Sequence, residues 1–319
     1  MRKVKIILLM GSLMLISCIS ACHSQGTLSL FSYSKKAGVG YSVYVSDGYA
    51  YITNNNGVVI FDVHQPKRPR KVGKITTGVT FGICIEKDLA YISAESGLVI
   101  ADVRDPVNPK ILTEYAFVNE TQGVQVEGSY VYIASERGLE ILNISNPGKV
   151  IPIAHIGDSP IIRDVDVYDG IAYLASPGNG VEVIDVTDPV SPQKITTVAG
   201  TKGAWGFHIH NEFLYVGCHG YGVKILSLSD KKSPRIIGSF RDNDGGEALG
   251  VWGDGKHLYI ADNYNIEVLD VSDPTNPYEI SEYSKVIGAH DLCVDGKFIY
   301  VAEAKKGLII FEVKQEQRR

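Results

Sequence analysis

A tyrosine inside a short apolar segment recurs at nearly constant spacing, and this recurrence constrains the fold more than any other feature of the chain. The seven copies, called the repeat tyrosines below, are Tyr51, Tyr91, Tyr132, Tyr173, Tyr215, Tyr259 and Tyr300. Their successive spacings, by subtraction, are 40, 41, 41, 42, 44 and 41 residues. A repeat of this length made of short alternating strands matches one four-stranded propeller blade. The sequence therefore predicts an all-β protein, a seven-bladed β-propeller of four-stranded antiparallel blades.

Each repeat carries further signals at fixed distances from its tyrosine. The residue eight positions earlier is always apolar, as an innermost strand packed between blades requires: Val43, Ile83, Val124, Val165, Phe207, Val251 and Leu292. Acidic-glycine pairs just before the tyrosine predict tight hairpins: Asp47-Gly48, Glu127-Gly128, Asp169-Gly170, Asp254-Gly255 and Asp295-Gly296. A position six or seven residues after it predicts a positive φ: Gly57, Gly97, Gly138, Gly180, Gly222, Asn265 and Gly307.

The third strand of each repeat ends on a short polar side chain and leads into a proline turn. These strand ends are Asp62, Asp102, Asn143, Asp185, Ser227, Asp270 and Glu312. The turns that follow include Asp105-Pro106, Asn146-Pro147, Asp188-Pro189 and Asp273-Pro274, in which the side chain bonds to the backbone and proline presets φ. Because the carboxylates recur once per blade, we expect them to lie far apart and to serve the turns rather than metal or acid–base chemistry.

These segments resemble the LVIVD repeat of bacterial and archaeal surface proteins. The resemblance is carried by residues 97–103, which read Gly-Leu-Val-Ile-Ala-Asp-Val before Asp105-Pro106, and by residues 180–186 before Asp188-Pro189. It covers all seven units, from Gly40 to Val313. The fifth copy departs from it with Lys231-Lys232-Ser233-Pro234, and the seventh lacks Asp-Pro. The resemblance implies a propeller outside the cytoplasm and no settled activity.

The two ends of the chain complement each other. The seventh repeat stops after residues 307–313 without a fourth strand, whereas residues 27–33 alternate apolar and polar side chains and belong to no repeat. An open strand edge invites pairing with other chains. We therefore expect the N-terminal strand to complete the last blade, so that residues 28–319 form one propeller domain.

The first residues have the character of a bacterial lipoprotein signal. Arg2, Lys3 and Lys5 precede an apolar run from Ile6 to about Ile19, which is short for a membrane span. The run ends in small residues and cysteine, so residues 1–21 are expected to be a signal peptide, Cys22 the lipidated residue and residues 22–27 a tether. Cys18 is the alternative acceptor, and a soluble secreted protein is the alternative to lipidation. The expected location is the cell envelope, with contact to the membrane only through the lipid.

Composition and cysteine usage exclude some classes of partner. The formal charge is −5 with Lys and Arg scattered through the turns, which argues against nucleic acid. Cys84, Cys218 and Cys293 remain after the signal, one in each of three repeats, and an odd count is no disulfide framework. We expect them to be buried apolar side chains.

Positions that differ between repeats are the informative ones for function. Ten residues before the repeat tyrosine, where each inner strand begins, the side chains are Tyr41, Phe81, Gln122, Arg163, Trp205, Leu249 and His290. Asp164 and Asp291 lie one residue further on. Aromatic, cationic and amide side chains around one channel mouth are typical of a recognition surface; the alternative is that each ring fills a gap between blades. Loop residues after the second strand are expected to complete a polar cup: Asn54, Asn55, Glu95, Glu136, Arg137, Asn179, His219, Asp262, Asn263 and Glu303.

Two clusters have the composition of metal sites. His208 and His210 fall on one side of a strand with His219 on its hairpin partner, so these three imidazoles can be grouped into a zinc site. Asp242, Asp244 and Glu247 alternate oxygen donors with glycine, as calcium loops do. Half-buried histidines and an acidic surface loop are the alternative interpretations, and the sequence matches no complete metal motif.

Three functions compete. The favoured one is a non-enzymatic scaffold that binds an envelope protein or glycan at the channel mouth, with no cofactor. The second is a propeller hydrolase or lyase acting on a lactone or polysaccharide; no nucleophile elbow or complete metal ligand set supports it. The third is a quinoprotein, which the presence of only Trp205 and Trp252 disfavours, since such blades repeat a tryptophan.

Overall fold

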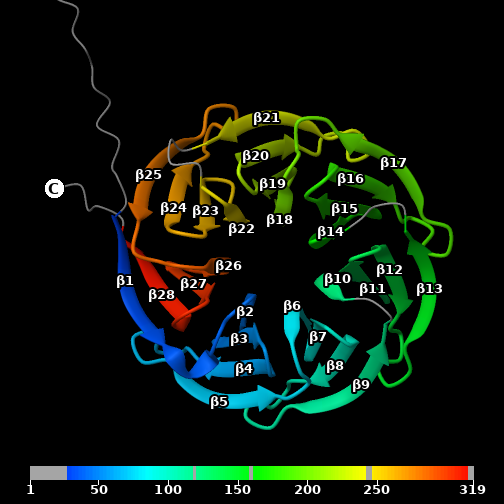
Figure 1. The fold of residues 1–319 in the computed structure, drawn as a ribbon, viewed down its shortest axis with the longest axis horizontal. Coiled ribbons are helices and arrows are strands. Elements are labelled where there is room, and N and C mark those ends of the chain that lie inside the picture. Colours follow the sequence, from blue (N-terminus) through cyan, green and yellow to red (C-terminus); the bar gives the residue numbers. More distant parts are fainter. Residues whose placement is uncertain (1–26, 118–119, 158–160, 242–245, 315–319) are drawn as a thin grey trace, which may run out of the picture.

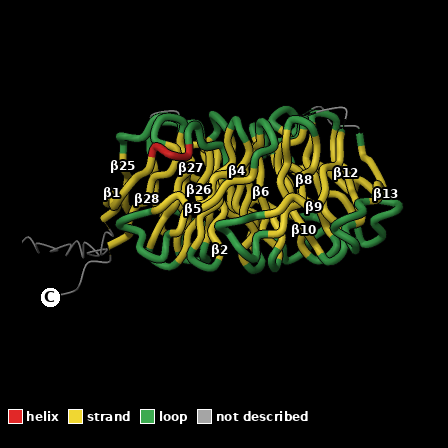
Figure 2. The backbone as a smooth tube through the Cα atoms, turned by 90° about the horizontal axis from the view of Figure 1, so that it is seen from below, coloured by secondary structure: helices red, strands yellow, loops and turns green. Residues whose placement is uncertain are grey.

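The computed structural model describes residues 27–117, 120–157, 161–241 and 246–314, and the described chain forms a ring of seven sheets. Each sheet has four strands, and the sheets radiate from a central channel like blades (Figure 1). Seen from the side the molecule is a flat disc with loops on both faces (Figure 2). The predicted seven-bladed, all-β propeller is confirmed.

The blades follow one another along the chain. Blades 1 to 3 consist of β2 (Val43–Ser46), β3 (Tyr49–Asn54), β4 (Gly57–Asp62) and β5 (Arg70–Ile75); β6 (Thr80–Glu86), β7 (Leu89–Ala94), β8 (Gly97–Asp102) and β9 (Lys110–Ala116); and β10 (Thr121–Glu127), β11 (Tyr130–Ser135), β12 (Gly138–Asn143) and β13 (Ile151–Ile156). Blades 4 and 5 consist of β14 (Asp164–Tyr168), β15 (Ile171–Ser176), β16 (Gly180–Asp185) and β17 (Gln193–Val198); and β18 (Ala204–His210), β19 (Phe213–Cys218), β20 (Gly222–Ser227) and β21 (Arg235–Phe240). Blade 6 consists of β22 (Ala248–Gly253), β23 (His257–Asp262), β24 (Ile266–Asp270) and β25 (Tyr278–Tyr283).

Blade 7 joins the two ends of the chain, as predicted. Its strand order is β1 (Thr27–Ser34), β28 (Gly307–Lys314), β27 (Phe298–Glu303) and β26 (Ala289–Asp295), and a short 3-10 helix, η1 (Lys35–Ala37), follows β1. The backbone N–H of Leu28 donates to Ser281 Oγ of blade 6 at 3.0 Å, and Ser32 Oγ donates to the Pro66 carbonyl of blade 1 at 2.6 Å. The N-terminal strand therefore contacts both neighbouring blades as well as closing its own.

The repeat tyrosines are packed into the protein interior. All seven are at most 4% exposed, and they lie in the apolar clusters that separate neighbouring blades. In blade 4 the Tyr173 hydroxyl donates to the Lys231 carbonyl at 2.9 Å. The predicted packing role is confirmed, because an aromatic ring fills the wedge between blades while its hydroxyl reaches a backbone group.

The predicted turn chemistry is present, with one exception. Asp47-Gly48 and Asp169-Gly170 have positive φ at both positions, as type I′ hairpins require. All six glycines predicted to begin a third strand also have positive φ, from 73° at Gly222 to 135° at Gly97. The prediction is wrong at Asn265, which does not have positive φ. There β23 and β24 are joined by a turn in which the Asp262 N–H donates to the Asn265 carbonyl, so no left-handed residue is needed.

The recurring carboxylates serve the turns. Oδ1 of Asp62, Asp102, Asp185 and Asp270 accepts the backbone N–H two residues ahead at 2.8–3.1 Å. Asp105 accepts from Val107 in the same way, and Asp230 supplies this bond in the fifth repeat, where Asp-Pro is missing. These side-chain-to-backbone bonds explain the repetition without any catalytic role.

Cys84, Cys218 and Cys293 are free and buried, as expected. The expected signal peptide, with Cys18 and Cys22, lies outside the described residues. Among the residues described, no helix has the length and apolar character needed to cross a membrane.

Candidate functional site

A cavity of about 320 Å³ lies at one mouth of the channel, and it collects the positions that differ most between repeats. All seven residues located ten before the repeat tyrosines line it; they are called the mouth ring: Tyr41, Phe81, Gln122, Arg163, Trp205, Leu249 and His290. The loops after the second strands meet the connections between blades on this face, as in the bonds from the Glu95 and His219 N–H groups to the Val79 and Gly203 carbonyls. The structure thus brings together every mouth residue singled out from the sequence.

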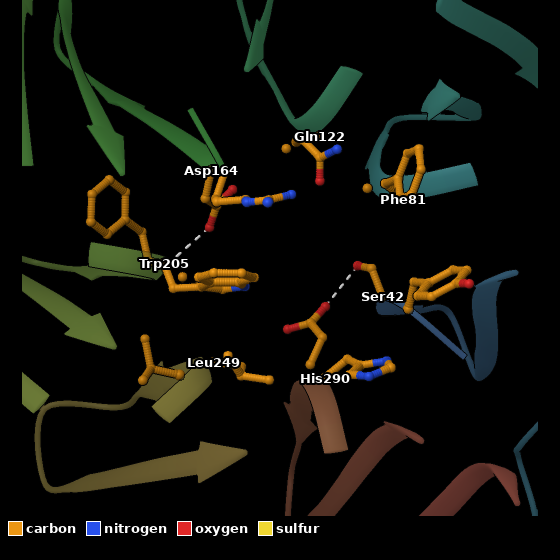
Figure 3. Close-up of a pocket in the computed structure, with 16 residues that line it drawn as sticks. Ser42, Phe81, Gln122, Asp164, Trp205, Leu249 and His290 are labelled. Carbon is orange, nitrogen blue, oxygen red and sulfur yellow. Dashed lines mark hydrogen bonds between the residues drawn. The ribbon is translucent and has the colours of Figure 1, made fainter. Parts of the chain in front are cut away.

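The mouth has two aromatic walls facing each other. Tyr41 is central to one wall, with its ring centroid 5.8 Å from Phe81 and 5.7 Å from His290. Trp205 is central to the other, with Arg163 Cζ 4.7 Å from its ring centroid and His219 stacked at 5.4 Å. Trp205 projects from the side opposite Phe81 and His290, and Gln122 and Leu249 lie between the two walls (Figure 3).

The Trp205 wall is supported by residues outside the cavity. His219, which stacks on Trp205, places its Nε2 3.5 Å from Glu247 Oε1. The second oxygen of Glu247 accepts from Asn263 Nδ2 at 2.9 Å. His219 and Asn263 are predicted for the cup, but neither lines the cavity. His219 stacks on the Trp205 indole, and Asn263 donates to the Glu247 carboxylate. The sequence predicts Glu247 only as part of an acidic loop.

Arg163 enters the cavity from a constrained segment of backbone. Ile161 has φ of 52°, a conformation that a β-branched residue rarely adopts. The N–H groups of Ile161, Ile162 and Arg163 donate to the Glu136, Ser135 and Ala175 carbonyls at 3.1, 3.0 and 2.8 Å. A strained residue held by three successive bonds fixes the direction in which the following side chain leaves the backbone.

The position after the mouth ring, called the clamp ring, holds either glycine or a polar residue in each blade: Ser42, Gly82, Gly123, Asp164, Gly206, Gly250 and Asp291. The glycines are needed because neighbouring inner strands approach closely here. A Cβ at Gly82 would lie 2.6 Å from the Gln122 carbonyl oxygen, and one at Gly206 would overlap the Leu249 carbonyl oxygen.

The two aspartates of the clamp ring join blades. Asp164 accepts the N–H of Val165 and, across the blade boundary, that of Phe207, both at 2.9 Å. Asp291 accepts from the Leu292 N–H at 2.8 Å, and across the boundary its Oδ2 accepts from Ser42 Oγ at 2.7 Å (Figure 3) and from the Val43 N–H at 3.1 Å. Both were predicted as binding residues. Both line the cavity, yet their oxygens are engaged by the protein.

Burial controls the charge of these carboxyls. It raises the pKa of Asp164 to about 8, although the N–H bond from Phe207 acts in the opposite direction, and it also raises the pKa of Asp291.

The expected cup of loop residues is wrong as a lining. None of the loop residues named from the sequence lines the cavity, whose walls come from the starts of the inner strands. Asn54, Asp262 and Glu303 are buried instead, and the Glu303 carboxylate accepts the Lys305 and Lys306 N–H groups of its own loop. Asn55 remains near the mouth, where it accepts the Tyr41 hydroxyl at 2.7 Å. Buried polar side chains had to satisfy backbone groups in tight loops, which the sequence pattern did not reveal.

The two metal clusters differ in outcome. Within the described parts of the chain, no group of three His, Cys, Asp or Glu side chains could hold a metal ion, so the zinc site through His208, His210 and His219 is not formed. His208 instead stacks on Trp252 at 4.0 Å between centroids, and burial lowers its pKa to about 4. Asp242 and Asp244 lie outside the described residues.

A second variable ring went unnoticed in the sequence. Three residues after the mouth ring the side chains are Tyr44, Cys84, Gln125, Asp166, His208, Trp252 and Cys293. Cys84 Sγ lies 3.1 Å from Gln125 Oε1, and Gln125 Nε2 donates to Asp166 Oδ1 at 3.0 Å. None of these seven residues lines the cavity. Their variation between repeats was the available signal.

The seven sheets define a β-propeller. Each blade contributes a different residue to one cavity, so the candidate site lies at the channel mouth. The LVIVD repeat family matches residues 37–77, 78–116, 119–152, 161–199, 245–285 and 288–313, and the chain belongs to this family. The fifth blade falls between matched segments, and it is the blade whose strand ends on Ser227 and whose turn lacks Asp-Pro.

Comparison with other proteins adds the fold alone. No curated protein matches the chain. The β-propeller domain of Cps50 (Swd1) from Myceliophteria thermophila is similar, with a TM-score of 0.74 at 12% identity over 90% of this chain and 100% of that one. The WD40 repeats of RRP9 give 0.71 at 12% identity over 90% and 97%. The computationally designed Ika8 protein gives 0.67 at 8% identity over 91% and 100%.

Proposed function

We propose that this protein is a non-enzymatic binding module that holds an envelope protein or glycan through the cavity at its channel mouth. The observation that supports this most is the convergence of seven different side chains, one from each repeat, on one cavity. These seven side chains share one cavity and differ in size, charge and hydrogen-bonding groups, whereas the repeat tyrosines, which pack between blades, are identical. Concave, mainly apolar sites with a few polar groups are the usual form of ligand sites.

The carboxylates at the mouth favour binding over catalysis. A hydrolase or lyase that works with a pair of carboxyls needs carboxyl oxygens within reach of the bound substrate. Asp164 and Asp291 both line the cavity, but each directs its oxygens to the N–H groups of its own and the next blade. They are therefore suited to holding the ring together.

We further propose export and lipidation at Cys22. The basic and apolar N-terminal residues support this, as does the place of β1 at the outer edge of blade 7 (Figure 1). Thr27 is the fifth residue after Cys22, a span of at most about 17 Å when fully extended. A lipid there would hold the disc by its rim. Metabolic labelling with a fatty acid tests this: Cys22→Ala should abolish incorporation and Cys18→Ala should not, whereas labelling of both variants would contradict lipidation at Cys22.

Capture of envelope material tests the binding function. The full-length protein with a C-terminal tag is cross-linked in cells and purified, and co-purifying proteins and glycans are compared between variants. Trp205→Ala should lose the partner. Tyr264→Ala is the matched control, because this aromatic side chain is 61% exposed on a loop and does not line the cavity. Capture that survives both Trp205→Ala and Arg163→Gln would rule out the mouth as the binding site.

A further inference from the structure

We propose that the mouth cavity selects a small ring compound carrying one carboxylate, and that Arg163 binds that carboxylate. This inference rests on the proposed binding function and specifies its ligand class. It starts from the Arg163 guanidinium, which lines the cavity and forms no ion pair with any described residue.

Arg163 has no anionic partner among the residues that the structure describes. None of the ion pairs among the described residues includes it, and no described acceptor lies within hydrogen-bonding distance of its Nε, which is buried. Asp164 and Asp291, the carboxyls of the lining, are engaged by backbone N–H groups. A buried donor without an acceptor costs stability, so a ligand acceptor there would gain what the apo protein lacks.

The position of Arg163 suits a planar acid. Its Cζ lies 4.7 Å from the Trp205 ring centroid, so the cation contacts the indole while the N–H groups remain in the guanidinium plane. An arginine fork binds a carboxylate through two parallel bonds, which adds geometry as well as energy. The Trp205 wall, supported by His219 and Glu247, and the constrained backbone at Ile161 keep this fork in one place.

The other residues of the lining limit the ligand to one negative charge and a compact body. Among the residues that the structure describes, Arg163 is the only Lys or Arg that lines the cavity, so the lining supplies one positive charge to balance one negative charge and leaves the second charge of a phosphate dianion unpaired. Phe81, Leu249 and the half-buried Phe207 offer apolar surface. A cavity of about 320 Å³ is at the lower end of the range for ligand sites, which fits a single ring.

Sugar acids and aromatic acids share this chemistry, and the test separates them. The chain has two tryptophans, so in a Trp252→Phe background the fluorescence reports on Trp205 alone. The full propeller is titrated with glucuronate against glucose, with benzoate against benzyl alcohol, and with inorganic phosphate, and calorimetry repeats each titration. We expect one of the two acids to bind at least about tenfold more tightly than its neutral counterpart and than phosphate. The acid that binds identifies the source.

Arg163 variants test the assignment. Arg163→Gln should weaken binding of the acid by about 10- to 100-fold and leave the neutral counterpart unchanged. Arg163→Lys should recover part of the loss, because it keeps the charge and loses the fork. Arg68→Gln, in the exposed turn between β4 and β5, is the matched control and should change nothing. Unchanged melting temperatures show that the variants fold.

The outcomes separate the two proposals. Equal binding of acids and neutral counterparts, an undiminished acid affinity in Arg163→Gln, or no binding of any probe at 10 mM, roughly the weak limit of specific recognition, would overturn the ring-carboxylate inference. The binding function would still stand if envelope capture depended on Trp205. If capture did not depend on Trp205 or Arg163, the binding function itself would fall.

Discussion

The repeat tyrosines and the mouth ring occupy equivalent positions in the same seven blades, yet they are opposites in every other respect. The tyrosines are identical and almost fully buried between blades. Ten residues earlier the mouth ring contains seven different side chains at an open cavity. Each blade packs against its neighbour in an equivalent environment, so the same residue, tyrosine, is favoured at all seven positions. The channel mouth is a single place shared by all blades, so each blade can contribute something different to it.

The clamp ring lies between these extremes. Four of its seven residues are glycine, because adjacent strands leave no room for a Cβ, while Asp164 and Asp291 bridge blade boundaries with their carboxyl groups. Neighbouring inner strands are thus joined in two ways. Either a glycine lets the two backbones approach closely, or an aspartate side chain accepts the N–H groups of the next strand. Variation between repeats therefore does not by itself identify a ligand site.

The largest effect should come from the tyrosine ring. Tyr173→Ala removes a fully buried ring and should lower the free energy of unfolding by about 3–5 kcal/mol, measured by urea denaturation. Tyr173→Phe should cost only about 1 kcal/mol, the net value of the bond from its hydroxyl to the Lys231 carbonyl. If Tyr173→Ala lowered the free energy of unfolding no more than Trp205→Ala does, the repeat tyrosines and the mouth ring would not differ in their importance for packing.

The clamp ring should give the next largest effect. Gly206→Ala places a methyl group against the Leu249 carbonyl oxygen and should cost about 1–3 kcal/mol by forcing β18 away from β22. Gly178→Ala is the control, since a Cβ there meets no atom within 4 Å, and it should change the unfolding free energy by less than about 0.5 kcal/mol. Equal tolerance at both sites would show that the strands separate freely at the mouth.

Asp164 should give a pH signature. Burial raises its folded-state pKa to about 8, so the folded protein retains a proton that the unfolded chain loses near pH 4. Its contribution to stability is therefore fully present below about pH 4 and is lost as the pH rises to about 8.

Unfolding curves at several pH values should show a flatter decline over this window for Asp164→Asn than for the native chain. Asp102→Asn is the control, because hydrogen bonds from Arg104 lower the pKa of Asp102 to about 2 and its contribution is constant over the same window. Parallel pH curves for the native chain and Asp164→Asn would show that this carboxyl is ionised throughout.

The smallest effect on stability should come from the mouth ring itself. Trp205→Ala loses contacts with Arg163 and His219 in a half-buried setting and should cost only about 1 kcal/mol, while it removes ligand binding. Thermal denaturation and the capture experiment, made on the same preparation, check the two halves of this expectation. A large loss of stability would mean that the ring serves packing, the alternative considered from the sequence.

The sequence was sufficient to predict the architecture because each signal recurs in most of the seven repeats, so a departure in one copy does not hide the pattern. The repeat period predicted seven blades, and residues 27–33, which belong to no repeat, predicted the closing strand. The residues ten positions before the repeat tyrosines predicted the complete mouth ring. The failures are single residues without a repeated pattern. Asn265 lies in a turn of different geometry, and the loop residues expected in a cup include Asn54 and Glu303, which satisfy buried backbone groups instead.

What the sequence determined by itself is the repeated part. Strand length and turn chemistry depend on neighbours a few residues away, and the number of blades follows from the number of repeats. The tertiary structure alone decided which unlike side chains meet, since Asp164 reaches the N–H of Phe207 43 residues later and Asp291 reaches Ser42 across 249 residues. Ring closure sets those contacts. Each depends on the two particular residues that a blade boundary brings together, and a pattern common to all blades carries no information about that pairing.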